Sequence, residues 1–132
     1  MNYFKLLECQ TTAIILNKLF YNSPKLFHFI LQNFNSLTDI QKNIPTITTH
    51  IKIKNTQRLL SLTTISVTKE LTFLKKNNIH TLTLNNPKYP SQLKELTFPP
   101  PLLFYKGNPK CLDLPCLAIV CLLYTSPSPR DP

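Results

Sequence analysis

Glycine is almost absent from this sequence, which contains one glycine and twelve prolines in 132 residues. Phosphate-binding loops of the G-x-G-x-x-G or G-x-x-x-x-G-K type need several residues that adopt positive φ or let a phosphate approach the backbone closely. A self-contained P-loop or dinucleotide site is therefore excluded. The length allows one ordinary domain or two small ones, which leaves no room for a large multi-site enzyme.

Long apolar runs and metal-binding spacings are also missing. The longest apolar run, residues 116–123, is far shorter than the roughly 20 residues of a membrane-spanning helix, and the N-terminus lacks the pattern of a secretory signal. We therefore expect a cytoplasmic protein without membrane contact. The cysteines form no C-x-x-C pair, which favours reduced thiols over a metal site or a disulfide, and no cofactor is expected. They are Cys9, Cys111, Cys116 and Cys121.

Acidic side chains are scarce, and the resulting charge indicates a possible partner. The chain has 15 basic and 6 acidic residues, a net charge of +9 and a sequence pI near 9.6. Clustered cations gain free energy by releasing counterions from nucleic acid. The alternative is amino-acid drift in an AT-rich genome, because lysine outnumbers arginine by thirteen to two. Charge alone leaves both interpretations open.

The proline content divides the chain into a proline-poor first part and a proline-rich second part, because only Pro24 and Pro45 precede residue 87. Apolar residues at helical spacing, with Ser23-Pro24 and Ser36 as N-terminal signals, predict helices before that point. The predicted helices cover residues 3–20, 24–34, 37–44, 47–62 and 67–78. The last of them is capped by Ser66 and ends at Asn77-Asn78, which suit a left-handed turn.

After residue 78 the apolar period changes from 3.6 to 2. Residues 79–84 alternate apolar and polar side chains, which predicts a strand, and further strands are predicted at 102–105 and 117–120. A short helix at 91–96, a rigid run of three prolines at 99–101 and a Gly107-Asn108 turn separate them. The residues alone therefore predict a helical front followed by the opening of an α/β sheet.

Three motifs in this second part follow one another in order. They are Tyr89-Pro90-Ser91-Gln92-Leu93, then Pro99-Pro100-Pro101-Leu102-Leu103-Phe104-Tyr105-Lys106-Gly107-Asn108, then Ala118-Ile119-Val120. This succession resembles the YPxxL, PPxxLFxxGN and AIVG steps of the DNA-processing protein A family, also called DprA or Smf. The helical front is similar to the N-terminal helical domain of that family, although it has no glycine beside Phe34-Asn35-Ser36.

The resemblance implies a fold, a division into domains and a function. Residues 1–66 are expected to form an all-helical, SAM-like domain, and residues 67–120 the start of a Rossmann-like, SLOG-type α/β domain. The family binds single-stranded DNA and assists loading of the RecA recombinase during natural transformation of competent bacteria. It catalyses no reaction, and the full-length protein is a candidate homodimer. No catalytic or metal-binding residue is therefore expected.

The resemblance ends after Val120, where the family continues with glycine, a small residue and arginine, and this chain has Cys121-Leu122-Leu123. Residues 121–131 are similar to a translated sequencing-library adapter, so we expect residues 121–132 to be a non-native tail. A fragment without the pocket-forming loop is expected to be inactive alone and to bind single-stranded DNA much more weakly than a full-length relative. The alternative is the front of a nucleotide-binding Rossmann-like enzyme, such as a nucleotide hydrolase or a phosphoribohydrolase.

The candidate nucleic-acid-binding residues are Lys106, Gly107 and Asn108, because a turn with a cation and a glycine can present backbone N–H groups to a phosphate. A simple turn between strands is the competing interpretation. Tyr89, Phe104 and Tyr105 lie near lysines, as base-stacking aromatics do, but Phe104 is expected in the core. Two lysine stripes are explained equally well as solvated helix faces. They comprise Lys52, Lys54 and Arg58, and Lys69, Lys75 and Lys76.

Overall fold

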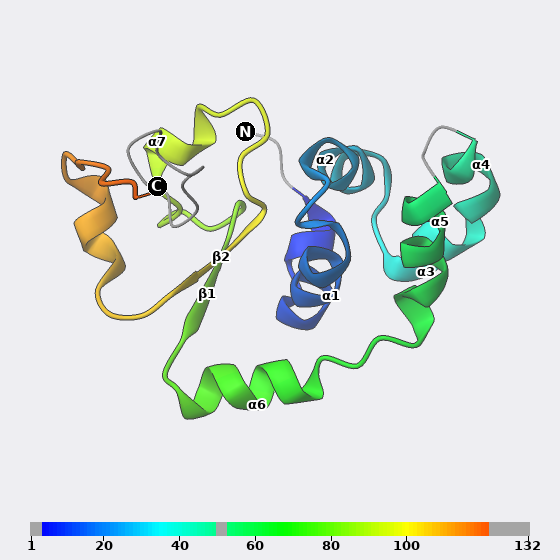
Figure 1. Ribbon diagram of the computed structural model, residues 1–132, viewed down its shortest axis with the longest axis horizontal. Coiled ribbons are helices and arrows are strands. Elements are labelled where there is room, and N and C mark those ends of the chain that lie inside the picture. Colours follow the sequence, from blue (N-terminus) through cyan, green and yellow to red (C-terminus); the bar gives the residue numbers. More distant parts are fainter. Residues whose placement is uncertain (1–3, 50–52, 122–132) are drawn as a thin grey trace, which may run out of the picture.

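The computed structural model describes residues 4–49 and 53–121 and places a group of helices beside a two-stranded antiparallel sheet (Figure 1). We call this strand pair the hairpin, although residues 84–101 with a short helix connect its strands. Most of the expected tail, residues 122–132, lies outside the described residues, as do residues 1–3 and 50–52. The architecture is a mixed α+β arrangement. In chain order the elements are η1 (Lys5–Leu7), α1 (Gln10–Phe20), α2 (Pro24–Asn33), α3 (Leu37–Lys42), α4 (Ile44–Thr48), α5 (Ile53–Leu60), η2 (Ser61–Thr63), α6 (Thr68–Lys76), β1 (His80–Thr83), α7 (Ser91–Lys94), β2 (Leu102–Tyr105) and η3 (Pro109–Asp113).

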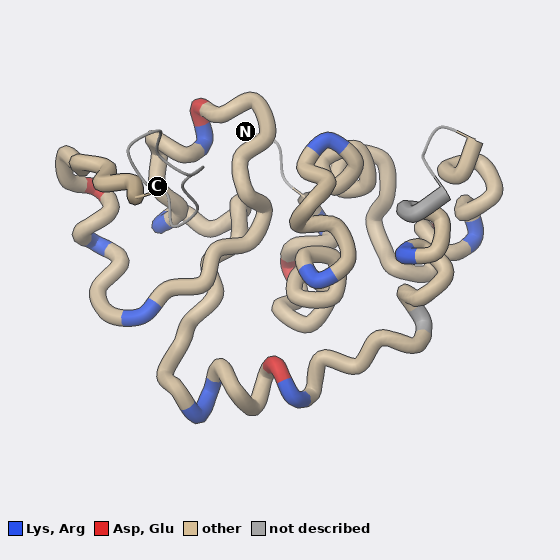
Figure 2. The backbone as a smooth tube through the Cα atoms, in the orientation of Figure 1, with Lys and Arg blue, Asp and Glu red and all other residues tan. Residues whose placement is uncertain are grey.

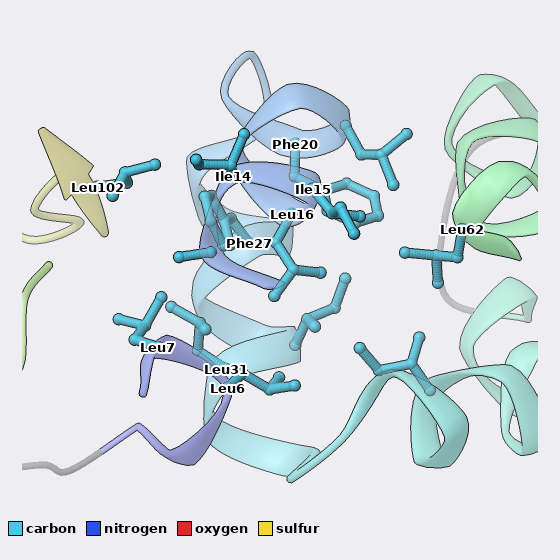
Figure 3. Close-up of a cluster of buried hydrophobic side chains, with 14 of the residues drawn as sticks. Leu6, Leu7, Ile14, Ile15, Leu16, Phe20, Phe27, Leu31, Leu62 and Leu102 are labelled. Carbon is cyan, nitrogen blue, oxygen red and sulfur yellow. The ribbon is translucent and has the colours of Figure 1, made fainter. Parts of the chain in front are cut away.

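Helix α1 is the centre of the hydrophobic core. Its buried residues lie on more than one side of the helix, which is typical of a helix surrounded by other elements. Leu16 and Phe20 have no exposed surface, and the Phe20 ring lies 6.3 Å from that of Phe27 in α2. Figure 3 shows Leu62 approaching this cluster from the helical side and Leu102 from the hairpin. One core therefore connects the helices with β2.

Several helix ends follow from local sequence signals. Helix α2 begins at Pro24, where the missing N–H of proline removes no helical hydrogen bond. The Ser36 hydroxyl accepts a hydrogen bond from the Asp39 N–H at 3.1 Å and caps α3. Asn78 takes a φ of 56° after α6, as a left-handed helix end requires. These three predictions are confirmed.

Strands β1 and β2 form an antiparallel pair in which His80 lies opposite Tyr105 and Thr83 opposite Leu102. Side chains alternate between the two faces along a strand, so Leu102 and Phe104 share one face, and Leu102 joins the core of the helices on that face. Leu102 is 5% exposed within the core. Leu82 points to the other face and is buried there. Each face of the pair therefore buries one leucine.

Four residues distant in sequence connect the helices to the hairpin, and we call them the joint: Phe4, His28, Asn85 and Pro99. The Phe4 N–H donates to Asn85 Oδ1 at 2.9 Å, and Asn85 Nδ2 donates to the Phe4 carbonyl at 2.7 Å. His28 Nε2 lies 2.6 Å from the Pro99 carbonyl oxygen. A carbonyl only accepts, so Nε2 carries the proton.

Two further polar contacts orient the elements beside the joint. Gln10 Nε2 at the start of α1 donates to Thr81 Oγ1 of β1 at 2.8 Å. Lys18 of α1 forms an ion pair with Glu70 of α6. This ion pair links helix α6 to α1 before the chain enters the hairpin. In the view of Figure 1, α6 lies below α1 and the hairpin.

Some predicted elements are wrong or displaced. Residues 117–120 form no strand, and Leu117 and Ile119 are about nine-tenths exposed, because no described strand lies beside this segment to pair with it. Helix α1 begins at Gln10 rather than at residue 3, since the chain first makes the separate turn η1. The N-cap residue of α6 is Val67 rather than Ser66, although Ser66 Oγ accepts a long hydrogen bond of 3.5 Å from the Thr68 N–H at the start of the helix. Within the helix predicted at 47–62, α4 ends at Thr48 and α5 is described from Ile53 to Leu60.

The joint predicts a stability effect. Replacing Asn85 by alanine leaves the partly buried Phe4 N–H without its hydrogen-bond acceptor. We expect Asn85→Ala to lower the free energy of unfolding by roughly 1–3 kcal/mol, measured by urea denaturation. Asn33→Ala is the control, because the Asn33 amide bonds only to Phe29 of its own helix at the surface. Equal stability of the two variants would contradict a structural role of the joint.

Candidate nucleic-acid interface

The turn after β2 brings Lys106, Gly107 and Asn108 to the surface, where all three are exposed. Gly107 has a φ of 98°, a conformation that side chains with a Cβ rarely adopt. Asn108 Oδ1 accepts a hydrogen bond from the Lys110 N–H at 3.0 Å, which starts η3. The predicted turn is therefore present. The Lys110 N–H is engaged within it and is not free to meet a phosphate.

A cavity of about 270 Å³ lies next to this turn. It is lined by Lys88, Pro109, Lys110 and Asp113, so the segment after β1 and the helix η3 meet there. The Asn86 side chain holds the Lys88 backbone N–H at 2.9 Å, as Asn108 holds that of Lys110. Two such turns thus bring two lysines to one cavity that has a single acidic residue in its lining. This arrangement has a net positive charge and suits an anionic ligand.

Basic positions recur along the segment that follows β2, and an acidic position lies near its end (Figure 2). Lys106, Lys110 and Lys88 are all exposed. Of the predicted lysine stripes, Lys69, Lys75 and Lys76 lie exposed on α6, whereas Lys52 is outside the described residues. Arg58 Nη1 lies 3.5 Å from Ser23 Oγ.

In the structure the aromatic candidate Tyr89 is buried, whereas Phe104 is exposed. Tyr89 is only 2% exposed, and its hydroxyl donates to the Pro100 carbonyl at 2.7 Å, so its ring does not offer a stacking surface. Phe104, expected in the core, is 47% exposed. The same face of β2 is therefore buried at Leu102 and open at Phe104. Tyr105 lies against the His80 ring, with 5.4 Å between centroids.

His28 is a residue that sequence reasoning missed. It is 6% exposed, lies between the rings of Phe4 and Phe98, and bonds to Pro99 as described above. A lone histidine in an apolar helix stripe gives no sequence signal for such a contact 71 residues away. His80 is exposed on β1, and His50 lies outside the described residues.

The cysteines and the acidic residues do not form a metal-binding site among the described residues. Cys9, Cys111, Cys116 and Cys121 all lie at the surface. Within residues 4–49 and 53–121, no three His, Cys, Asp or Glu side chains come together as metal ligands would. The turn and its cavity therefore remain the site that the residues of the second part build.

The motifs that lead into this turn lie in a segment that is similar to a known protein family. Residues 80–122, about a third of the 132-residue chain, match the family model of DNA recombination-mediator protein A. The matched segment contains β1, the Tyr89-Pro90 step, β2 and the Lys106–Asn108 turn. The resemblance to the DNA-processing protein A family is thus confirmed over this segment. No curated protein and no solved structure gave a significant match to the chain.

Tyr89 predicts a pH dependence of stability. Burial raises the pKa of its hydroxyl to about 12, above the value of about 10 of an unfolded tyrosine. The folded protein then holds this proton more strongly than the unfolded chain, so the stabilisation is complete below about pH 10 and is lost as the pH rises towards 12.

We expect the urea midpoint of the wild-type protein to fall between about pH 10 and 12 more steeply than that of Tyr89→Phe. The absorbance of tyrosinate, followed in the folded protein, should show one late-titrating group that is missing in the variant. Parallel pH profiles of the two proteins would show that burial of this hydroxyl has no such effect.

Proposed function

We propose that this chain is a DNA-processing protein of the DprA type, which binds single-stranded DNA, assists RecA loading during natural transformation and catalyses no reaction. The observation that carries the proposal is the position of the turn. The matched family segment contains an exposed turn, with Gly107 at positive φ, beside a cavity lined by Lys88 and Lys110. The net charge of +9 supports a polyanionic partner.

We also propose that the chain is divided into two structural units. Residues 1–66 would be the SAM-like helical unit, and residues 67–120 the beginning of the Rossmann-like unit that carries the turn. The protein would act in the cytoplasm, with RecA as a partner and the full-length protein as a homodimer. None of the described helices combines the length and apolar character that crossing a bilayer requires.

Binding through the turn would be electrostatic, and this makes it testable. Each lysine that contacts a phosphate contributes about 0.7 to the slope of log affinity against log salt for a single strand. Lys106 and Lys110 flank Gly107 and Asn108 and are both exposed, so neither is needed for the core.

We expect the double variant Lys106→Ala/Lys110→Ala to bind an oligodeoxythymidylate more weakly at low salt and to reduce the salt slope by about 1.4. Fluorescence anisotropy across a salt series measures both quantities. The matched control is Lys25→Ala/Lys42→Ala, which removes the same charge from exposed positions of α2 and α3. If both double variants lose affinity equally, net charge and not the turn governs binding.

A further inference from the structure

A second concavity, which we call the α1–α6 groove, lies between the two helices and the end of β2. It is an open groove with a volume of about 770 Å³ and a mostly apolar lining. Its volume lies within the range of ligand-binding pockets, and its walls come from four separate stretches of the chain. The lining residues are Ile14, Asn17, Lys18, Tyr21, Lys69, Glu70, Phe73, Leu74, Ile79 and Phe104.

Three aromatic side chains of this groove are open to solvent. Tyr21 is 63% exposed, Phe73 59% and Phe104 47%. Exposed apolar rings gathered at one concavity mark a binding surface rather than a core. Aromatic rings also give every nucleobase a flat surface to stack on, whatever its sequence.

The rim of the groove is basic. Lys18 pairs with Glu70, and its hydrogen bond holds the pKa of that carboxyl below its usual range, so Glu70 is ionised and offsets one of the two lysines. Lys69 adds a further positive charge, and Lys75 and Lys76 extend it along the exposed side of α6. A ligand with flat apolar faces and a negatively charged backbone complements both features.

The groove also continues into the turn. Phe104 lines the groove and Lys106 belongs to the turn, two residues further along the chain. An extended chain advances about 3.3 Å per residue, so the two sites are separated by roughly 7 Å of backbone. A ligand that crosses the end of β2 therefore meets both.

We propose that the α1–α6 groove binds a single-stranded nucleic acid, with bases stacked on Tyr21, Phe73 and Phe104 and the phosphate backbone passing Lys69 towards the turn. The inference rests on the proposed function and extends it to helices outside the segment that matches the family. A duplex is excluded as the ligand, because its base faces are already stacked on each other and only the edges are accessible. Stacking in the groove adds affinity with little dependence on salt.

The test separates stacking from apolar contact at one position. Phe73→Leu keeps an apolar side chain but removes the ring, whereas Phe73→Tyr keeps the ring. We expect Phe73→Leu to weaken binding of an oligodeoxythymidylate roughly five- to tenfold at low salt with an unchanged salt slope. Phe73→Tyr should stay within about twofold of the wild type, since it still stacks.

Phe29→Leu is the matched control, because Phe29 is 39% exposed on α2 and packs against Phe34, outside the groove. Its affinity should equal that of the wild type. Thermal unfolding of each variant shows that it is folded, and sedimentation velocity reports its oligomeric state.

The outcomes distinguish the two proposals. If the wild-type chain does not bind the oligonucleotide, the proposed function fails and this inference with it. If Phe73→Leu binds like the wild type while Lys106→Ala/Lys110→Ala is weakened, only the groove is refuted. A dimer of the wild type that Phe73→Lys dissociates would assign the groove to a second copy of the chain and overturn the inference.

Discussion

The reciprocal hydrogen bonds between the Asn85 side chain and the Phe4 backbone hold the hairpin against the helices, and the arrangement of both depends on them. A two-stranded hairpin is at best marginally stable alone, so β1 and β2 need a surface to pack on. Burial of Leu102 supplies the apolar contact. Apolar contact has no direction, however, and the joint fixes which edge of the hairpin meets which helix. Without it the α1–α6 groove has no third wall.

Local chemistry predicted the elements whose ends depend on one or two residues. Proline at the first position of α2, the Ser36 cap of α3 and the left-handed Asn78 after α6 act within a few residues of themselves. The alternating pattern around β1 and the exact extent of β2, residues 102–105, were visible for the same reason. These features need no knowledge of what lies across the fold.

The candidate site was less visible, because contacts between distant residues decide it. The turn at Gly107 follows from its own sequence, whereas the cavity beside it requires Lys88 to meet η3. Tyr89 and Phe104 carry no signal that tells a buried ring from an exposed one, since both are aromatic residues beside lysines. The strand predicted at 117–120 failed because β-propensity produces a strand only where a partner lies alongside.

The joint also determines the order in which parts of the fold can form during synthesis of the chain. Phe4 is synthesised 81 residues before Asn85, whose side-chain oxygen accepts its N–H. At about 5–20 residues per second, the Phe4 N–H waits several seconds for that acceptor. During this interval α1 can pack against the helices that follow it, but the hairpin has not yet been made. The side of α1 that Leu102 will cover therefore stays open to chaperones and to other nascent chains.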